Sequence, residues 1–164
     1  VSCDIHLTSV AGQKWIVLIG LIENNPYEVF CGLLSEINLP KYAQKGTIIK
    51  SPKGTYYLSL LDDDEKVLKL NIKKSFKNDG CESAMTRLVS LNLRHRVDIK
   101  FIIKQLEKSE GDMTTFAKAI NRILKKYIEE GSKLTGENCP NCQNDSLIHQ
   151  SGCILCNSCG WSKC

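Results

Sequence analysis

The most reactive residues of the sequence gather in one segment, since six of its nine cysteines lie between positions 139 and 164. The six are Cys139, Cys142, Cys153, Cys156, Cys159 and Cys164. Two Cys-x2-Cys pairs bring four thiolates within reach of one tetrahedral ion, and zinc is the usual occupant of such a site. The spacing therefore predicts about one zinc ion per chain, held entirely by sulfur.

Two of these six thiols are left over, because four ligands complete a structural zinc site. Cys164 is the last residue of the sequence, and a chain end is mobile unless it is tied down. Two spare thiols beside a metal site predict dithiol–disulfide chemistry. The other cysteines, Cys3, Cys31 and Cys81, are scattered, and we expect each to be a small buried hydrophobic side chain. His149 lies among the cysteines, but better-spaced thiols make it a poor ligand candidate.

Composition and charge indicate whether nucleic acid or a membrane should be expected as a partner. The 164 residues are 42% hydrophobic with a net charge of +4, a mild balance that gives no reason to expect nucleic acid. No apolar run reaches membrane-spanning length and residues 1–10 show no targeting signal, so we expect no membrane partner and a cytoplasmic location. Clustered Cys-x2-Cys pairs then favour metal and redox use over a disulfide scaffold. We find no complete active site, such as a Ser-His-Asp set or a phosphate-binding glycine loop.

The first half of the chain has the signals of short strands. Strands are predicted over residues 5–10, 15–22, 27–33, 47–50, 55–61 and 66–72. The run from Trp15 to Ile22 is continuously apolar, which predicts a strand buried on both faces. We expect Asn24-Asn25-Pro26 to break the chain after it and the acidic residues 62–65 to form a turn. Five or six short strands in close succession predict an antiparallel meander.

From Glu82 the apolar period becomes helical. The spacing predicts a first helix from Glu82, a second capped by Asp98, and a third from Met113 to Ile128 that stops at Gly131. The polar residues 132–138 then predict a flexible linker. The sequence thus predicts an α+β protein: an antiparallel meander with about three helices over 1–131, a linker over 132–138, and a small zinc ribbon over 139–164.

With these parts identified, the sequence resembles the C-terminal region of adenosylcobalamin-dependent (class II) ribonucleotide reductases. The first resembling stretches are Cys3-Asp4-Ile5-His6, Gly12-Gln13-Lys14-Trp15, Val17-Leu18-Ile19-Gly20-Leu21 and Pro26-Tyr27-Glu28-Val29-Phe30-Cys31-Gly32. The next are Arg87-Leu88-Val89-Ser90-Leu91-Asn92-Leu93-Arg94-His95, Ile103-Lys104-Gln105-Leu106 and Asp112-Met113-Thr114-Thr115-Phe116. The most specific are Gly136-Glu137-Asn138-Cys139-Pro140-Asn141-Cys142 and residues 152–164. The part before the cysteines is similar to the module called a TSCPD domain, although that five-letter string is absent.

The sequence departs from the family pattern at two places. Arg96 stands where the resemblance leads us to expect glycine, and Gln143 and Asn144 follow Cys142 where a glycine is usual in a zinc knuckle. If the position of Arg96 needs a positive φ, Arg96 would be mildly strained or its turn would differ. Neither departure removes a thiol.

The resemblance implies a function. Enzymes of this family use adenosylcobalamin to make a thiyl radical and reduce the ribonucleotide 2′ position for DNA synthesis, and a cysteine pair on a tail re-reduces the active-site disulfide. It implies as partners an upstream catalytic barrel of the same enzyme, which binds the cobalamin, and an external thiol reductant, and it is compatible with a homo-oligomer. The alternative is a zinc-ribbon module that binds nucleic acid or protein without a redox role, which leaves the surplus thiols idle.

Two partitions of the six thiols agree with the spacing. In the first, Cys139, Cys142, Cys156 and Cys159 bind zinc, and Cys153 and Cys164 are spare. In the second, Cys139, Cys142, Cys153 and Cys156 bind zinc, and Cys159 and Cys164 form the redox shuttle pair. The resemblance to the terminal pair of other ribonucleotide reductases favours the second. Zinc lowers the pKa of nearby thiols, so exchange between the two roles also stays open.

Overall fold

A computed structural model of the chain describes residues 1–40, 43–61, 66–76, 80–134 and 136–164. By its internal contacts the chain divides into two compact units, unit 1 over Val1–Ile120 and unit 2 over Asn121–Cys164. The acidic turn predicted over 62–65 lies outside the described residues. Each unit is described by itself below.

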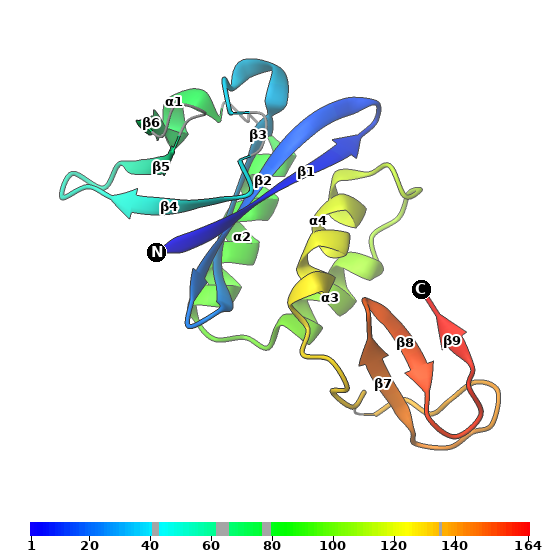
Figure 1. Ribbon diagram of the computed structural model, residues 1–164. Coiled ribbons are helices and arrows are strands. Elements are labelled where there is room, and N and C mark those ends of the chain that lie inside the picture. Colours follow the sequence, from blue (N-terminus) through cyan, green and yellow to red (C-terminus); the bar gives the residue numbers. More distant parts are fainter. Residues whose placement is uncertain (41–42, 62–65, 77–79, 135) are drawn as a thin grey trace. The chain divides into compact units, whose positions relative to one another are not determined.

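Unit 1 is built on one six-stranded antiparallel sheet (Figure 1). Its strands are β1 (Ser2–Val10), β2 (Gln13–Ile22), β3 (Asn25–Leu33), β4 (Lys45–Lys50), β5 (Tyr56–Leu61) and β6 (Val67–Asn71). Their order in the sheet is β3-β2-β1-β4-β5-β6. The sheet is thus two three-stranded meanders joined side by side, because β4 pairs with β1 instead of β3. The predicted α+β class is confirmed, with this one rearrangement of the single meander.

The break predicted at Asn24-Asn25-Pro26 is displaced. The turn between β2 and β3 is Glu23-Asn24, both with positive φ, and Pro26 lies inside β3 opposite Leu21. A proline lacks an N–H and so disfavours central strands, but β3 is at the edge of the sheet, where the missing donor is tolerated. The Asn residues signalled a turn correctly, and the edge position lets β3 begin at Asn25, so that Pro26 lies inside the strand.

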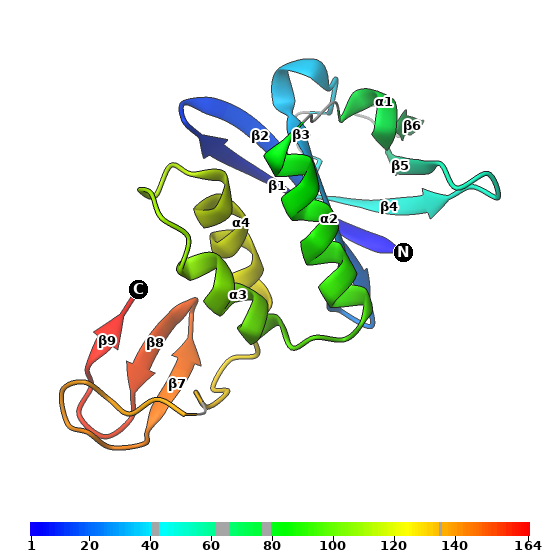
Figure 2. The same cartoon turned by 180° about the vertical axis from the view of Figure 1, so that it is seen from behind.

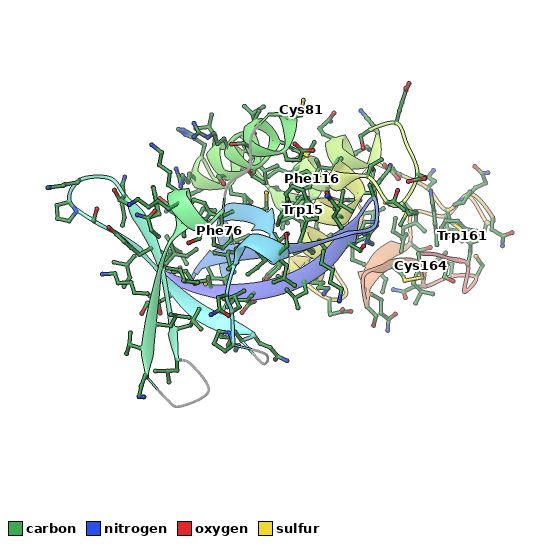
Figure 3. All side chains as sticks on the ribbon, turned by 90° about the horizontal axis from the view of Figure 1, so that it is seen from above. Trp15, Phe76, Cys81, Phe116, Trp161 and Cys164 are labelled. Carbon is green, nitrogen blue, oxygen red and sulfur yellow. A yellow bond between two sulfur atoms is a disulfide. The ribbon has the colours of Figure 1, made fainter. Side chains whose placement is uncertain are left out.

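The strand β2 is buried on both faces, as its apolar run predicted. One face, with Ile16 and Leu18, belongs to a core cluster that also takes residues from β1, β4, β5 and the following helix. Its buried members are Cys3, Ile5, Ile16, Leu18, Ile37, Ile48, Leu58, Leu60, Ile72 and Phe76. On the other face the helices pack: the Trp15 ring lies 5.2 Å, centroid to centroid, from that of Phe116, and the two are labelled side by side in Figure 3.

The helices of the chain follow the sheet. They are α1 (Ile72–Ser75), α2 (Cys81–Arg94), α3 (Ile99–Glu107) and α4 (Phe116–Leu124), with 3-10 turns η1 (Leu34–Glu36) and η2 (Lys125–Tyr127). Asp98 caps α3 as predicted, accepting a hydrogen bond from the Lys100 N–H. The third predicted helix is shorter at both ends than Met113–Ile128: Asp112 binds the Thr114 N–H in a local turn before it, and Ile128 is extended after it. Among the described residues, no helix has the length and apolarity needed to cross a membrane.

The helix α2 closes the open edge of β3 (Figure 2). The Ser90 hydroxyl accepts from the Val29 N–H at 2.8 Å and donates to the Val29 carbonyl at 3.1 Å, so it satisfies both edge groups. Four residues further on, Arg94 forms an ion pair with the buried Glu28 carboxylate. Two stretches that carried the family resemblance therefore meet in space and have a structural role.

Beneath that ion pair the backbone of β2 comes close to the Glu28 side chain. Gly20 pairs with Glu28 across the strands, and a Cβ at Gly20 would lie 2.7 Å from the Glu28 Cγ. Only a residue without a side chain leaves room for the carboxylate to lie flat against β2 and reach Arg94.

The departure at Arg96 also has a structural outcome. Arg96 has a φ of 58° at the end of α2, where the Arg96 N–H donates to the Leu93 carbonyl and the Val97 N–H to the Asn92 carbonyl. These are the two bonds of a Schellman motif, whose left-handed residue is usually glycine. The positive φ on which the expectation of mild strain depended is therefore present at Arg96.

Candidate metal centre and disulfide

Four of the six clustered cysteines bring their sulfurs together in unit 2. The sulfurs of Cys139, Cys142, Cys156 and Cys159 all lie within 4.8 Å of one another. The Cys139 and Cys159 sulfurs are 3.7 Å apart, and those of Cys142 and Cys156 are 3.6 Å apart. Cys139 and Cys156 are buried, whereas Cys159 is exposed. The cluster therefore has a closed side against the protein and an open side toward solvent.

Two matching turns build this cluster. In the first, the Gln143 N–H donates to the Cys139 carbonyl at 2.8 Å, and in the second the Gly160 N–H donates to the Cys156 carbonyl at 2.9 Å. Gln143 and Gly160 have φ values of 64° and 75°, so each turn ends on a left-handed residue directly after its second cysteine. Each turn points both of its thiols to one side, and Gln143 takes the conformation for which glycine was expected.

A small sheet holds the second turn. It consists of β7 (Leu147–Gln150), β8 (Cys153–Cys156) and β9 (Ser162–Lys163), in that order and all antiparallel. Its buried residues are Cys139, Leu147 and Cys156, with Leu134, Ile154 and Trp161 packed against them. Part of the segment predicted as a linker is built into this ribbon, because Ser132 and Leu134 exchange backbone hydrogen bonds with β7.

The strand β8 separates two kinds of sulfur. Side chains three positions apart in a strand point to opposite faces, so Cys153 and Cys156 cannot turn toward the same ion. Cys153 instead forms a disulfide with Cys164, with a Cα–Cα distance of 4.3 Å. Figure 3 shows this bond beside the Cys164 label. The register of β8 with β9 continues to this pair, so the two residues stand directly opposite each other.

The arrangement of the sulfurs differs from the partition preferred from the resemblance. That partition assigned Cys153 to the metal with Cys139, Cys142 and Cys156, and paired Cys159 with Cys164 as the shuttle. In the structure Cys159 joins the cluster and Cys153 joins Cys164, which is the other partition. The Cys-x2-Cys spacing of Cys153 and Cys156 resembles a metal-binding pair, but both residues lie in an extended strand and no turn reorients them.

The surroundings of the cluster favour thiolates at two positions. The Ser146 hydroxyl, 3.1 Å from the Cys156 sulfur, is the main cause of a Cys156 pKa lowered to about 6. The Asn141 side-chain amide donates to the Cys159 sulfur at 3.5 Å and lowers the pKa of Cys159. Metal ligands must be deprotonated, so these two hydrogen-bond donors favour the form of Cys156 and Cys159 that can bind a cation. Neither residue was predicted from the sequence: Asn141, between Cys139 and Cys142, had a visible signal in its position, whereas Ser146 lies outside the cysteine pairs.

The sulfur geometry agrees with zinc. Four sulfurs about 2.3 Å from a tetrahedral zinc ion would be about 3.8 Å from one another. The Cys139–Cys159 separation of 3.7 Å and the Cys142–Cys156 separation of 3.6 Å are close to that distance. The four-cysteine cluster is therefore compatible with a zinc ion.

The remaining sequence candidates lie apart from this cluster. Cys3 and Cys31 are buried, as expected, and burial raises the pKa of Cys3 to about 12. Cys81 is exposed at the start of α2, so the expectation that it is buried is wrong. His149 lies in β7 opposite Ile154 and is not among the clustered groups.

Comparison with known proteins finds a family match for the part of the chain that contains the six-stranded sheet and its helices. A family model described as the NrdJ homologue C-terminal domain matches residues 1–129. No curated protein and no solved structure matches the chain. The family match ends before the ribbon, whose assignment depends on its own geometry. Because the match covers well over half of the chain, the chain belongs to the family of NrdJ homologue C-terminal domains, a family related to the class II ribonucleotide reductases.

Proposed function

We propose that this chain is the C-terminal part of an adenosylcobalamin-dependent ribonucleoside-diphosphate reductase and that its ribbon passes electrons to the active-site disulfide of that enzyme. The family match supports the first half of this proposal. The observation that carries the second half is the disulfide between Cys153 and Cys164 on the face of β8 opposite the four-thiol cluster. One set of sulfurs is thus arranged for a metal and another for exchange.

In this proposal the cluster of Cys139, Cys142, Cys156 and Cys159 holds zinc. The ion, when bound, neutralises the thiolates and ties the two turns together. The chain itself excludes water on one side of the cluster, where Cys139 and Cys156 are buried, and donates hydrogen bonds to Cys156 and Cys159. The role of the metal centre is to keep the ribbon folded while its disulfide opens and closes.

The electron transfer is a pair of thiol–disulfide exchanges. The Cys164 thiolate attacks the active-site disulfide and releases one active-site thiolate, which takes up a proton. The Cys153 thiolate then attacks the Cys164 sulfur, forms the Cys153–Cys164 disulfide and releases the second active-site thiol. Two electrons leave the ribbon, and an external dithiol returns them. Cys164 is assigned the attack because it is exposed, whereas Cys153 is half-buried.

The upstream barrel would supply the rest of the reaction. Adenosylcobalamin supplies the radical chemistry when bound there, and no residue of this chain is proposed to bind it. The residues of this chain that act are the sulfur pair and the ligands that hold it in place.

The decisive experiment replaces one sulfur in the full-length enzyme. Cys164→Ser should retain about one zinc per chain and complete a first turnover. Sustained turnover with a protein dithiol reductant should fall at least about tenfold, because the tail can no longer close its disulfide. The matched control is Cys81→Ser, which removes an exposed thiol outside the ribbon and should turn over like the parent.

The competing function is a zinc ribbon that binds nucleic acid or protein without a redox role. If Cys164→Ser and Cys153→Ser both sustain turnover at the parent rate, the relay is refuted and this alternative is favoured. Failure of Cys164→Ser to bind zinc even at saturating free zinc would overturn the division of roles between the two sets of sulfurs.

A further inference from the structure

The loop that the disulfide closes contains two residues of the four-cysteine cluster. Cys153 and Cys164 are 11 positions apart, and the loop that they close contains Cys156 and Cys159. The other two clustered cysteines, Cys139 and Cys142, lie outside that loop. The bond therefore restrains two of the four candidate ligands without contributing a sulfur to the metal.

Few backbone hydrogen bonds hold this loop in place. The strand β9 has two residues and pairs with β8 only at Ser162 and Lys163. Beyond that pairing, the Cys156 N–H donates to the Trp161 carbonyl at 2.7 Å, the Gly160 N–H to the Cys156 carbonyl at 2.9 Å, and the Asn157 N–H to the Ser146 carbonyl at 3.0 Å. A ribbon edge this short is marginal by itself in water. When the disulfide is reduced and no metal is bound, residues 157–164 should therefore sample many conformations.

We propose that zinc binding at the cluster and the Cys153–Cys164 disulfide stabilise each other, so that the oxidised ribbon binds zinc more tightly than the reduced one. This inference deepens the proposed function and rests on its metal assignment. In the reduced chain, zinc binding must order the loop that carries Cys156 and Cys159. In the oxidised chain the disulfide has already removed much of that freedom. Chain-entropy arguments for a loop of this size set an upper limit of about 100-fold in affinity.

By thermodynamic linkage, an effect of the disulfide on zinc affinity requires an equal effect of zinc on the reduction of the disulfide. If the oxidised ribbon binds zinc more tightly, then zinc must stabilise the disulfide against reduction by the same factor. A tenfold effect on affinity corresponds to a reduction potential lowered by about 30 mV for this two-electron couple. The zinc-loaded Cys153–Cys164 dithiol is thus the stronger electron donor, which is the direction that a relay to an active-site disulfide needs.

The sign of the effect separates this linkage from competition for ligands. If Cys153 were itself a zinc ligand, the disulfide would remove a ligand and the reduced chain would bind zinc more tightly. In the structure Cys153 and Cys156 lie on opposite faces of β8, so the disulfide takes no sulfur from the cluster. Loop restraint and ligand competition therefore predict opposite changes.

The first test measures zinc affinity by chelator competition on the 164-residue chain. Three forms are compared: the oxidised chain, the same chain reduced with a phosphine, and the double variant Cys153→Ser/Cys164→Ser. We expect both open forms to bind zinc about 10- to 100-fold more weakly than the oxidised form. The reduced wild type controls for the serine substitutions, and Cys81→Ser should behave like the parent in either state.

The second test measures the reduction potential of this one disulfide. Differential alkylation and mass spectrometry at Cys153, in redox buffers with low or saturating free zinc, should show a potential about 30 to 60 mV lower with zinc. Equal zinc affinity in all three forms, or an unchanged potential, would refute the linkage and leave the metal centre intact. Tighter zinc binding by the reduced chain would refute it in favour of ligand competition. Absence of zinc binding in every form would overturn the proposed metal centre and the linkage with it.

Discussion

The core cluster of unit 1 and the core under the ribbon of unit 2 bury different side chains. In unit 1 the cluster around Ile16, Leu18 and Leu58 is almost entirely aliphatic and aromatic, and its one cysteine, Cys3, is an inert filler with a raised pKa. Under the ribbon, two of the three buried residues are Cys139 and Cys156. Small folds with too little apolar area commonly depend on metals or disulfides. Within one chain, the large core thus uses a buried cysteine as one packing residue among many, whereas two of the three buried side chains of the small core belong to the four-cysteine cluster.

Among the predicted changes, removal of zinc should have the largest effect, and it should affect the ribbon but not unit 1. A strong chelator should abolish amide protection over residues 139–163, because three buried residues cannot hold the ribbon alone. Unit 1 should keep its protection and a cooperative thermal transition, since its core contains no metal ligand. The measurement is hydrogen exchange with and without chelator, followed by a melt. Protection that persists in the ribbon, or collapse of β1–β3 along with it, would contradict the contrast between the units.

Breaking the buried ion pair between Arg94 and Glu28 tests the same comparison by a change in unit 1. Arg94→Met leaves the Glu28 carboxylate buried without its partner, so we expect a loss of about 2 kcal/mol in unit 1. The double variant Glu28→Gln/Arg94→Met should recover part of it, because the charge is gone as well. Denaturant midpoints give the stability, and zinc content should be unchanged throughout. A shift in zinc content would show that the two units are not independent.

The smallest effect comes from the same substitution made once in each unit. Arg96→Gly should stabilise unit 1 by about 0.5–1 kcal/mol, because glycine adopts the left-handed φ of 58° without strain. Gln143→Gly, at a φ of 64°, should leave the melt of unit 1 unchanged and raise zinc affinity a few-fold instead. Paired melts and chelator titrations distinguish the two. If both substitutions move the same observable, the relief of strain is not local to each unit.

The sequence was most informative where a pattern had one structural meaning. The apolar run at β2 predicted a strand that is covered on both faces, because so many consecutive apolar side chains have to be buried. Asp98 predicted the start of α3, because an aspartate directly before a helical repeat is a common helix cap. Pro26 was misleading because a proline is tolerated in an edge strand but not in a central one. The order in which strands pair, and so which strand is at the edge, could not be read from the sequence. The six cysteines misled for a related reason: Cys153 and Cys156 have ligand spacing but strand conformation. Gly160, directly after Cys159 and matching the position of Gln143 after Cys142, was the local signal for the turn that brings Cys159 into the four-cysteine cluster.

The close approach of Gly20 to Glu28 has a consequence for how this family can vary. A side chain at position 20 would displace the carboxylate, and without the carboxylate Arg94 has no buried partner. The three positions should therefore be inherited as one unit: relatives that carry a larger residue at the first should have lost the acid at the second and the arginine at the third. Aligned relatives that vary the first position freely while retaining the other two would contradict this coupling.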